Sequence, residues 1–210
     1  MLVYNDVVNT IDNWRLVQTA QLDPAARAAQ MPDSIVEETL EYIIAHEVGH
    51  TLGFMHNMAA SAAIPTDSLR SPTFTRKHGT TASIMDYARF NYVAQPADRG
   101  VRLTPPRLGV YDFYAVEWAY RLFPGSKGYE DDAKQLRNLV GKHEGDPFYR
   151  YGLQQTNTRY DPSAIEEDLS NDPVKAGDYG MANLRFILSN LDKWIGDEDG
   201  GKRKAELYNE

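Results

Sequence analysis

One short stretch of the sequence combines side chains that can bind a metal ion with a side chain that can act as a base. If the stretch is helical, His46 and His50 lie four residues apart and project from one face toward a single ion. Glu47 stands between them, where its carboxylate can reach a water molecule beside that ion. Gly53 falls where a helix commonly stops with a left-handed residue, so the chain can turn back and bring in His56 as a third ligand. Three nitrogen ligands leave one position of a tetrahedral zinc ion open for water, as a hydrolytic site requires.

The alternative is an exposed, polar helix end that carries three unrelated histidines. All five residues of the motif stand at fixed offsets, and ordinary residue frequencies make that coincidence rare. We therefore expect a zinc site with His46, His50 and His56 as ligands and Glu47 as the catalytic base.

The residues before this motif predict the helix that positions it. Ser34 and Glu37 have the spacing of a capping box, with Ser34 as the N-cap residue. Gly49, inside the helix, costs roughly 1 kcal/mol relative to alanine, and a close packing partner would explain that cost. We expect a helix of about 19 residues whose apolar stripe is buried in a core. The residues of that stripe are Ile35, Val36, Leu40, Ile43, Ile44, Val48 and Leu52.

A second stretch, Ser-Ile-Met-Asp-Tyr at residues 83–87, adds a resemblance to a known family. With the extended histidine motif, it resembles the metzincin clan of zinc endopeptidases, in which a tight "Met-turn" places a methionine beneath the metal. The resemblance implies that the three histidines are ligands, that Glu47 is the general base and that Met85 is the hydrophobic floor of the site. The residues around both motifs are similar to a group of large bacterial zinc-dependent metalloproteases, over about residues 2–194.

The resemblance also singles out Tyr87. In the astacin and serralysin branches of the clan, a tyrosine two residues after the Met-turn methionine lies close to zinc, and Tyr87 holds that position. This implies that Tyr87 can ligate the resting metal and donate a hydrogen bond to the oxyanion that develops during the reaction. The alternative, a tyrosine that only packs beside the site, stays open.

Composition narrows the class of protein. With 22 Lys and Arg against 30 Asp and Glu, the net charge of −8 argues against nucleic acid as a partner. The chain has no cysteine, which excludes disulfides and thiolate zinc ligands. No segment has the roughly 18 apolar residues of a membrane span, and no signal peptide is visible. The resemblance implies export, so we expect an extracytoplasmic location (secreted, periplasmic or at the cell surface), with the signal upstream of this sequence.

The fold expected for these 210 residues is mainly α-helical. A complete metzincin catalytic domain is α+β, with a twisted sheet before its zinc helix and an edge strand that binds the substrate. Here only residues 2–4 of the segment before His46 have the pattern of a strand. We therefore expect the C-terminal part of a metzincin-like zinc catalytic domain in residues 1–124, with the upstream sheet largely absent, and a helical C-terminal extension in residues 125–210.

The remaining elements follow from apolar spacing and from proline and glycine positions. The Pro-Gly-Ser sequence at residues 124–126 is the strongest boundary. We expect helices at 6–22, 23–30, 107–123, 130–142, 161–168 and 173–194, a loop at 64–82, and a short strand within 146–156. The aromatic residues of the helix at 107–123 are expected in the core. Four carboxylates can either bind calcium or form a solvated face: Glu166, Glu167, Asp168 and Asp172.

These observations predict a zinc-dependent endopeptidase with a protein or peptide as its substrate. Two other classes stay open. One is a zinc-binding but inactive fragment or pseudoenzyme. The other is an interaction module whose helices serve the upstream part of the same polypeptide.

Overall fold

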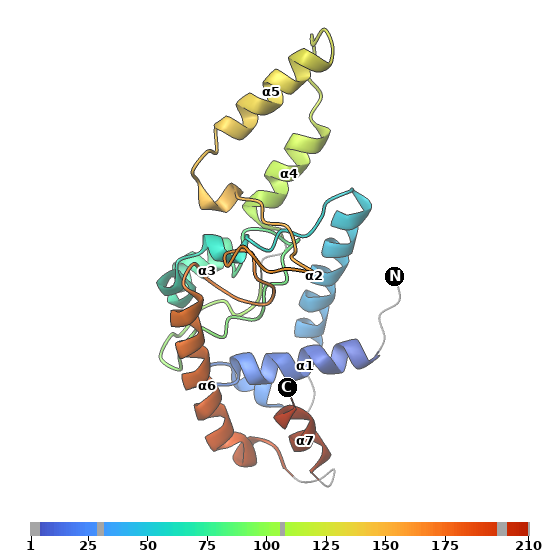
Figure 1. The fold of residues 1–210 in the computed structure, drawn as a ribbon. Coiled ribbons are helices and arrows are strands. Elements are labelled where there is room, and N and C mark those ends of the chain that lie inside the picture. The colour runs from blue at the N-terminus through green and yellow to red at the C-terminus, as the bar shows by residue number, and fades with distance from the viewer. Residues whose placement is uncertain (1–4, 29–31, 106–107, 197–200, 210) are drawn as a thin grey trace.

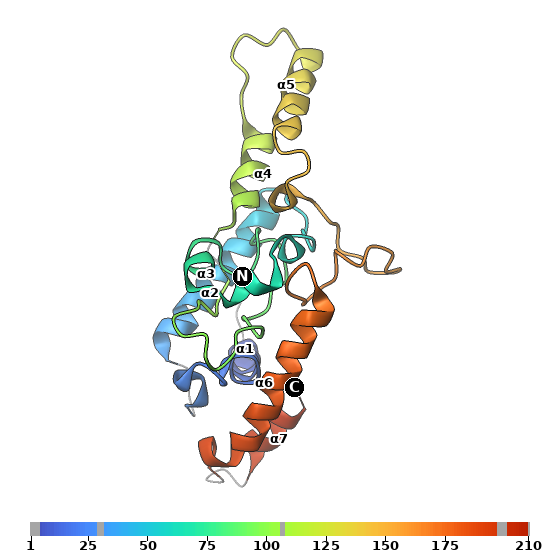
Figure 2. The ribbon, with the colours of Figure 1, turned by 90° about the vertical axis from the view of Figure 1, so that its left-hand side faces the viewer.

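The structure is a computed structural model that describes residues 5–28, 32–105, 108–196 and 201–209. Within these ranges it contains α-helices, short 3-10 helices and turns, and no strand. The molecule is elongated: α4 and α5 project from one end, while α1, α6 and α7 lie at the other (Figures 1 and 2). The expected helical character is confirmed, but an α+β domain is not seen in the described residues. Residues 2–4, expected as a strand, lie outside them.

The described part of the chain contains no candidate for a membrane-spanning helix. None of its helices combines the length and the apolar character needed to cross a lipid bilayer.

The helix that carries the histidine motif is α2, Asp33–Thr51, and it has the expected 19 residues. Its N-terminus corrects the predicted capping box. Pro32 is the N-cap residue, Ser34 lies inside the first turn, and no side chain caps the helix. The helix begins two residues earlier than predicted, and Asp33 then places a negative charge in the first turn, where the helix dipole stabilises it.

The C-terminus of α2 is a Schellman motif. Gly53 has a φ of 86°, and its N–H donates to the carbonyl of His50 at 2.9 Å. The N–H of Phe54 donates to the carbonyl of Gly49 at 3.1 Å. These two bonds satisfy carbonyls that the helix end would leave unpaired. The predicted left-handed stop at Gly53 is therefore confirmed, and it turns the chain back toward the histidine face.

The apolar stripe of α2 is not buried as expected. Ile44 and Val48 are 49% and 48% exposed, and the buried residues of the helix are His46 and Gly49. Ile44, Val48 and Leu52 of the stripe instead line an apolar groove of about 850 Å³ between α2 and α4, Val110–Tyr120. Helical spacing identifies an apolar face, but it does not show whether neighbouring elements cover that face.

Helices from the two ends of the chain share a core. α1, Asn5–Thr19, packs against α6, Pro173–Trp194, and α7, Lys202–Tyr208. The start of α6 is as predicted, because the Asp172 carboxylate accepts a hydrogen bond from the N–H of Lys175 at 3.0 Å. A 3-10 helix, η1 at Pro24–Arg27, takes the place of the helix expected at 23–30. The buried cluster consists of Leu16, Ala20, Ala26, Ile187, Leu191 and Leu207.

The segment expected as a loop at 64–82 contains helices. They are η3, Thr66–Arg70, and α3, Pro72–His78, which follow η2, Ser61–Ala63. Ser71 caps α3 by accepting from the N–H of Phe74 at 3.3 Å. Ser71 followed by a proline is a helix-start signal, and the general abundance of Pro, Ser and Thr in the segment concealed it.

The next two helices form an antiparallel pair that projects from the molecule (Figure 1). They are α4 and α5, Tyr129–Gly141, and both lie within one to three residues of their predicted ends. The aromatic residues of α4 are not in the core as expected, since Phe113 is 65% exposed and Trp118 is exposed as well. The predicted domain boundary falls in the connection between these helices and stays a prediction.

Residues 142–172 contain a 3-10 helix, η4 at Pro147–Tyr149, and otherwise turns and extended chain. The strand expected within 146–156 and the helix expected at 161–168 are therefore wrong. The segment is nevertheless well anchored. The N–H of Met58 donates to the carbonyl of Gly152 at 2.7 Å, and the N–H of Gly152 donates to Oδ1 of Asn57 at 2.8 Å. These bonds bring residues 150–152 beside the residues that directly follow His56.

Candidate metal centre

The three histidines of the motif converge, as the sequence predicts. Nε2 of His50 lies 3.1 Å from Nε2 of His56, which in turn lies 3.2 Å from Nε2 of His46. Among the described residues, these three histidines form a group of side chains close enough together to hold a metal ion. His46 and His50 come from α2, and the turn at Gly53 delivers His56.

The other ring nitrogen of each histidine shows where its proton lies. Nδ1 of His46 is 2.7 Å from the carbonyl oxygen of Ile84, and Nδ1 of His50 is 2.8 Å from that of Phe54. Nδ1 of His56 is 2.7 Å from Oε1 of Gln154. Because all three oxygens only accept hydrogen bonds, each neutral ring carries its proton on Nδ1. The three Nε2 lone pairs then face one another.

This arrangement fits a zinc ion. A tetrahedral zinc with Zn–N bonds of about 2.0–2.1 Å separates its nitrogen ligands by about 3.3–3.4 Å, close to the spacings between these Nε2 atoms. Three lone pairs at such distances repel one another unless a cation lies between them. Burial lowers the pKa of His46, which keeps its ring neutral, as metal binding requires.

Glu47 and Tyr87 lie at the open side of the histidine cluster. Glu47 is exposed on α2, and Tyr87 is 39% exposed. The ring of Tyr87 lies 4.5 Å from the ring of His56 and 5.6 Å from that of His46, measured between centroids. Burial raises the pKa of Tyr87, and the nearby carboxylates of Glu166 and Glu47 raise it further. The phenol therefore keeps its proton and can donate a hydrogen bond.

Met85 lies directly beneath the metal-binding helix. It is buried, in a turn that the N–H of Asp86 closes onto the carbonyl of Ser83. A Cβ atom added to Gly49 would overlap Sδ of Met85. The close partner expected for Gly49 is therefore this methionine, and the glycine lets the turn approach the helix.

We expect Gly49→Ala to destabilise the protein by about 1–3 kcal/mol, because the new methyl group must push Met85 out of its place. Gly177→Ala is the matched control, since Gly177 is also helical and has no heavy atom near its Cβ position. The control should gain up to about 1 kcal/mol from helix propensity. Urea unfolding of the two variants measures the contrast, and an equal gain in both would show that the contact with Met85 has no effect.

Two buried carboxylates that the sequence did not single out hold the turn around Met85. Asp112, in the first turn of α4, accepts from the N–H of Ile84 at 2.9 Å and from Oγ of Ser83 at 2.7 Å. Because the carbonyl of Ile84 faces His46, Asp112 helps to orient that ring through the backbone of a single residue, Ile84. Asp86 accepts from the N–H of Ser61 at 2.7 Å.

Asp86 gives the protein a testable pH dependence. Burial, with a smaller contribution from nearby Asp168, raises the pKa of this carboxyl to about 7. An unfolded aspartate titrates near pH 3.9, so between about pH 4 and pH 7 the folded state binds the additional proton. The stability from this protonated carboxyl is therefore fully present at low pH and is lost as the pH rises toward 7.

We expect Asp86→Asn to remove this contribution, because the amide is neutral at every pH. Its oxygen can still accept the hydrogen bond from Ser61. The measurement is the free energy of unfolding of the metal-free protein between about pH 5 and about pH 7. The variant should gain stability relative to the parent as the pH rises, and parallel pH profiles would show that Asp86 does not titrate in this range.

The four carboxylates near residues 166–172 do not form one solvated face. Glu166 accepts from Nε2 of Gln154 at 2.7 Å, and Glu167 pairs with Arg89 at 2.5 Å. Burial raises the pKa of Asp168 to about 6. Asp172 caps α6.

The remaining two histidines lie outside the site. His78 packs against Phe74, and His143 stacks on Tyr149 with 3.7 Å between the ring centroids.

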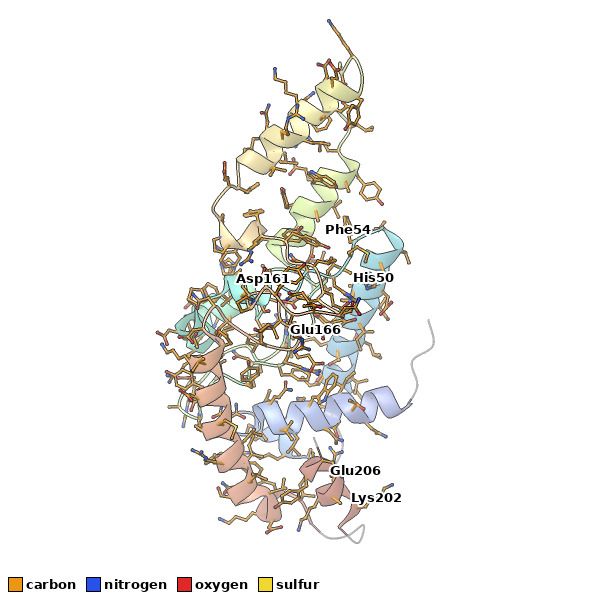
Figure 3. The ribbon with its side chains drawn as sticks, in the orientation of Figure 1. His50, Phe54, Asp161, Glu166, Lys202 and Glu206 are labelled. Atoms are coloured by element: carbon orange, nitrogen blue, oxygen red, sulfur yellow. The ribbon has the colours of Figure 1, made fainter. Side chains whose placement is uncertain are left out.

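Gln154 is a residue near the site that sequence reasoning missed, and Glu166 was singled out only as a candidate calcium ligand. Figure 3 shows Glu166 in the loop region that faces α2, the helix that carries His50. No spacing in the sequence links Gln154 to His56, because the two residues are 98 positions apart. The signal for Asp112 was present but overlooked, since an acidic residue three positions after a glycine is a common start of a helix.

Three convergent imidazoles in a helical protein form a candidate metal centre. Comparison with known families gives the class: the model of a family described as Met-zincin matches residues 28–210. The match covers most of the chain, so the protein belongs to the Met-zincin family, and the resemblance to metzincins is confirmed. Neither the curated proteins nor the solved structures compared with the chain gave a significant match. Membership suggests a zinc metalloprotease and implies zinc as the cofactor.

Proposed function

We propose that this protein is a zinc-dependent endopeptidase. The observation that carries the proposal is the convergence of three imidazole Nε2 atoms at 3.1–3.2 Å, each with its Nδ1 proton held by an acceptor. His46, His50 and His56 would be the ligands, and Glu47 follows the first of them on the same helix. Bound zinc supplies a Lewis acid that polarises a peptide carbonyl and lowers the pKa of water.

The side chains of this chain perform the proton transfers. Glu47 takes a proton from the attacking water and passes it to the nitrogen of the leaving amine. Tyr87 keeps its phenol proton and donates a hydrogen bond to the oxyanion of the substrate. Met85 forms the apolar floor that fixes the height of α2 above the turn. Glu47 and Tyr87 are thus in place as proton acceptor and hydrogen-bond donor before the substrate binds.

The substrate class proposed is protein or peptide, and the net charge of −8 argues against nucleic acid as a partner. We also keep the proposal that the upstream part of the same polypeptide contributes to the active protease, and that the protease works outside the cytoplasm. Both rest on the resemblance to metzincins.

A second candidate is an interaction module that binds zinc without cleaving peptides. The apolar groove between α2 and α4 favours it, because Val48, Leu52 and Trp118 line a surface that the described residues leave exposed. Apolar surface of this extent commonly marks a contact with another polypeptide.

The proposal is tested by removing and restoring the metal. The zinc-loaded protein should hydrolyse an unstructured protein such as casein, a strong chelator should abolish the activity, and added zinc should restore it. A protein that binds one zinc ion per chain and leaves casein intact would favour the interaction module instead.

A further inference from the structure

The ring of His56 is held in a different way from the other two. His46 and His50 donate their Nδ1 protons to backbone carbonyls, which can only accept. His56 donates to the side-chain amide of Gln154 at 2.7 Å. An amide has an accepting end and a donating end, and a rotation of its last torsion exchanges them. Something else must therefore decide which end faces His56.

Glu166 fixes the orientation of the Gln154 amide. Nε2 of Gln154 donates to Oε1 of Glu166 at 2.7 Å, and a carboxylate can only accept. The donating end of the amide is thereby held at Glu166, and the accepting end faces Nδ1 of His56. If the amide were reversed, Nδ1 would have to accept, and the proton of the neutral ring would move to Nε2. In that tautomer the ligand atom cannot bind a metal.

We propose that Gln154 and Glu166 are positioning residues that select the metal-binding tautomer of His56. We call this chain of hydrogen bonds, from the Glu166 carboxylate through the Gln154 amide to the His56 ring, the relay. It rests on one part of the proposed function, namely that the three histidines bind zinc. Gln154 contacts the ring of His56 directly, and Glu166 contacts it through the Gln154 amide.

The fold holds both members of the relay in place. Asn57, fully buried, donates from its N–H to the carbonyl of Met85 at 2.9 Å and from Nδ2 to the carbonyl of Arg150 at 3.0 Å. It thus joins the Met85 turn to the segment that carries Gln154. Gly152 has no room for a side chain, because a Cβ atom would lie 2.6 Å from Cβ of Ala59.

The residue that follows Glu166 has a constrained backbone. Glu167 has a φ of 67°, a backbone region that residues other than glycine rarely adopt. Its carboxylate pairs with Arg89, which follows the Met85 turn. Non-glycine residues in this region persist only where the surroundings enforce them, and they cluster at functional sites. Here the pair between Glu167 and Arg89 holds the turn that directly follows Glu166.

The relay is tested through zinc affinity, measured by competition with a chelating dye. Gln154→Ala removes the acceptor, and Glu166→Ala releases the amide. Each should weaken zinc binding about tenfold to a hundredfold, the usual effect of losing a partner of a metal-binding histidine. Their metal-free forms should unfold at nearly the parental temperature.

Gln155→Ala is the matched control. Gln155 holds the same loop by donating to the carbonyls of Asp161 and Ala164, each at 2.8 Å, and it has no bond to His56. The control should lower the stability of the metal-free protein more than it lowers zinc affinity. An equal loss of affinity in Gln155→Ala and Gln154→Ala would overturn the proposal, because loop order alone would then explain the effect.

An exchange of the two side chains provides a rescue. In the double variant Gln154→Glu, Glu166→Gln, the residue at 154 accepts from both His56 and the new amide. Zinc affinity should return to within about threefold of the parent. An exchange variant as weak as Gln154→Ala would contradict the relay.

Failure of the relay and failure of the proposed peptidase can be told apart, since zinc affinity is measured without substrate. A protein that shows these affinity changes but cleaves no peptide retains the relay and loses the peptidase. A peptidase whose Gln154→Ala variant binds zinc like the parent loses the relay alone.

Discussion

Glu47→Ala should abolish peptide hydrolysis while leaving zinc in place. Glu47 is exposed and is not one of the three metal-binding histidines. Its substitution therefore removes the proposed base and leaves the metal-binding side chains in place. General base catalysis contributes about a hundredfold to ten-thousandfold, and we expect a loss of that size in kcat/KM. Hydrolysis of a quenched fluorescent peptide measures the loss, and metal analysis checks the zinc content of the same sample.

Glu37→Ala is the matched control, because Glu37 is an exposed carboxylate on the same helix, away from the metal-binding residues. It should keep parental activity. A Glu47→Ala variant that cleaves the peptide at the parental rate would show that the activity comes from another site or from a contaminant.

His50→Ala should remove zinc binding itself. His50 supplies one of three nitrogens, and its Nε2 lies 3.1 Å from that of His56. Loss of a direct ligand should weaken zinc binding by more than about a hundredfold, the upper range for the loss of an indirect partner. The thermal stabilisation by zinc should disappear too; it amounts to about 4 kcal/mol when zinc exceeds its dissociation constant a thousandfold.

His143→Ala serves as the control for this prediction. His143 stacks on Tyr149 and lies outside the cluster, so the variant should bind zinc like the parent. Full zinc occupancy in His50→Ala would show that the cluster is not the metal site.

Local sequence signals predicted the part of the site that local structure builds. The spacing of His46 and His50 and the left-handed stop at Gly53 depend only on helix geometry, and both are found. The predicted start of α2 was two residues too late, since the N-cap is Pro32 and not Ser34. Several side chains near a helix start can be assigned as the cap from sequence alone, and the flanking Pro32 decided the outcome.

The burial of apolar side chains was predicted less accurately than the positions of the ligands. α4 is apolar on nearly all sides, which is typical of a helix inside a core, but Phe113 projects from the molecule. Composition records which side chains are apolar, whereas burial depends on what lies opposite each of them.

The support around the ligands was beyond sequence reasoning. Gln154 reaches His56 only because Asn57 pairs with the segment that contains Gly152, and this pairing joins residues far apart in the chain. A glutamine in an irregular segment carries no periodic signal. The histidine motif therefore predicted the ligands, while the residues that orient them became visible only in the structure.

The most direct test of the central claim is to identify the products formed from an unstructured protein by mass spectrometry. Zinc-loaded parent and Glu47→Ala protein are incubated with it at equal zinc content. The proposed mechanism predicts peptides cut at internal bonds with the parent and essentially none with the variant. An intact substrate with the zinc-loaded parent, or the same products in equal amounts with both proteins, would contradict it.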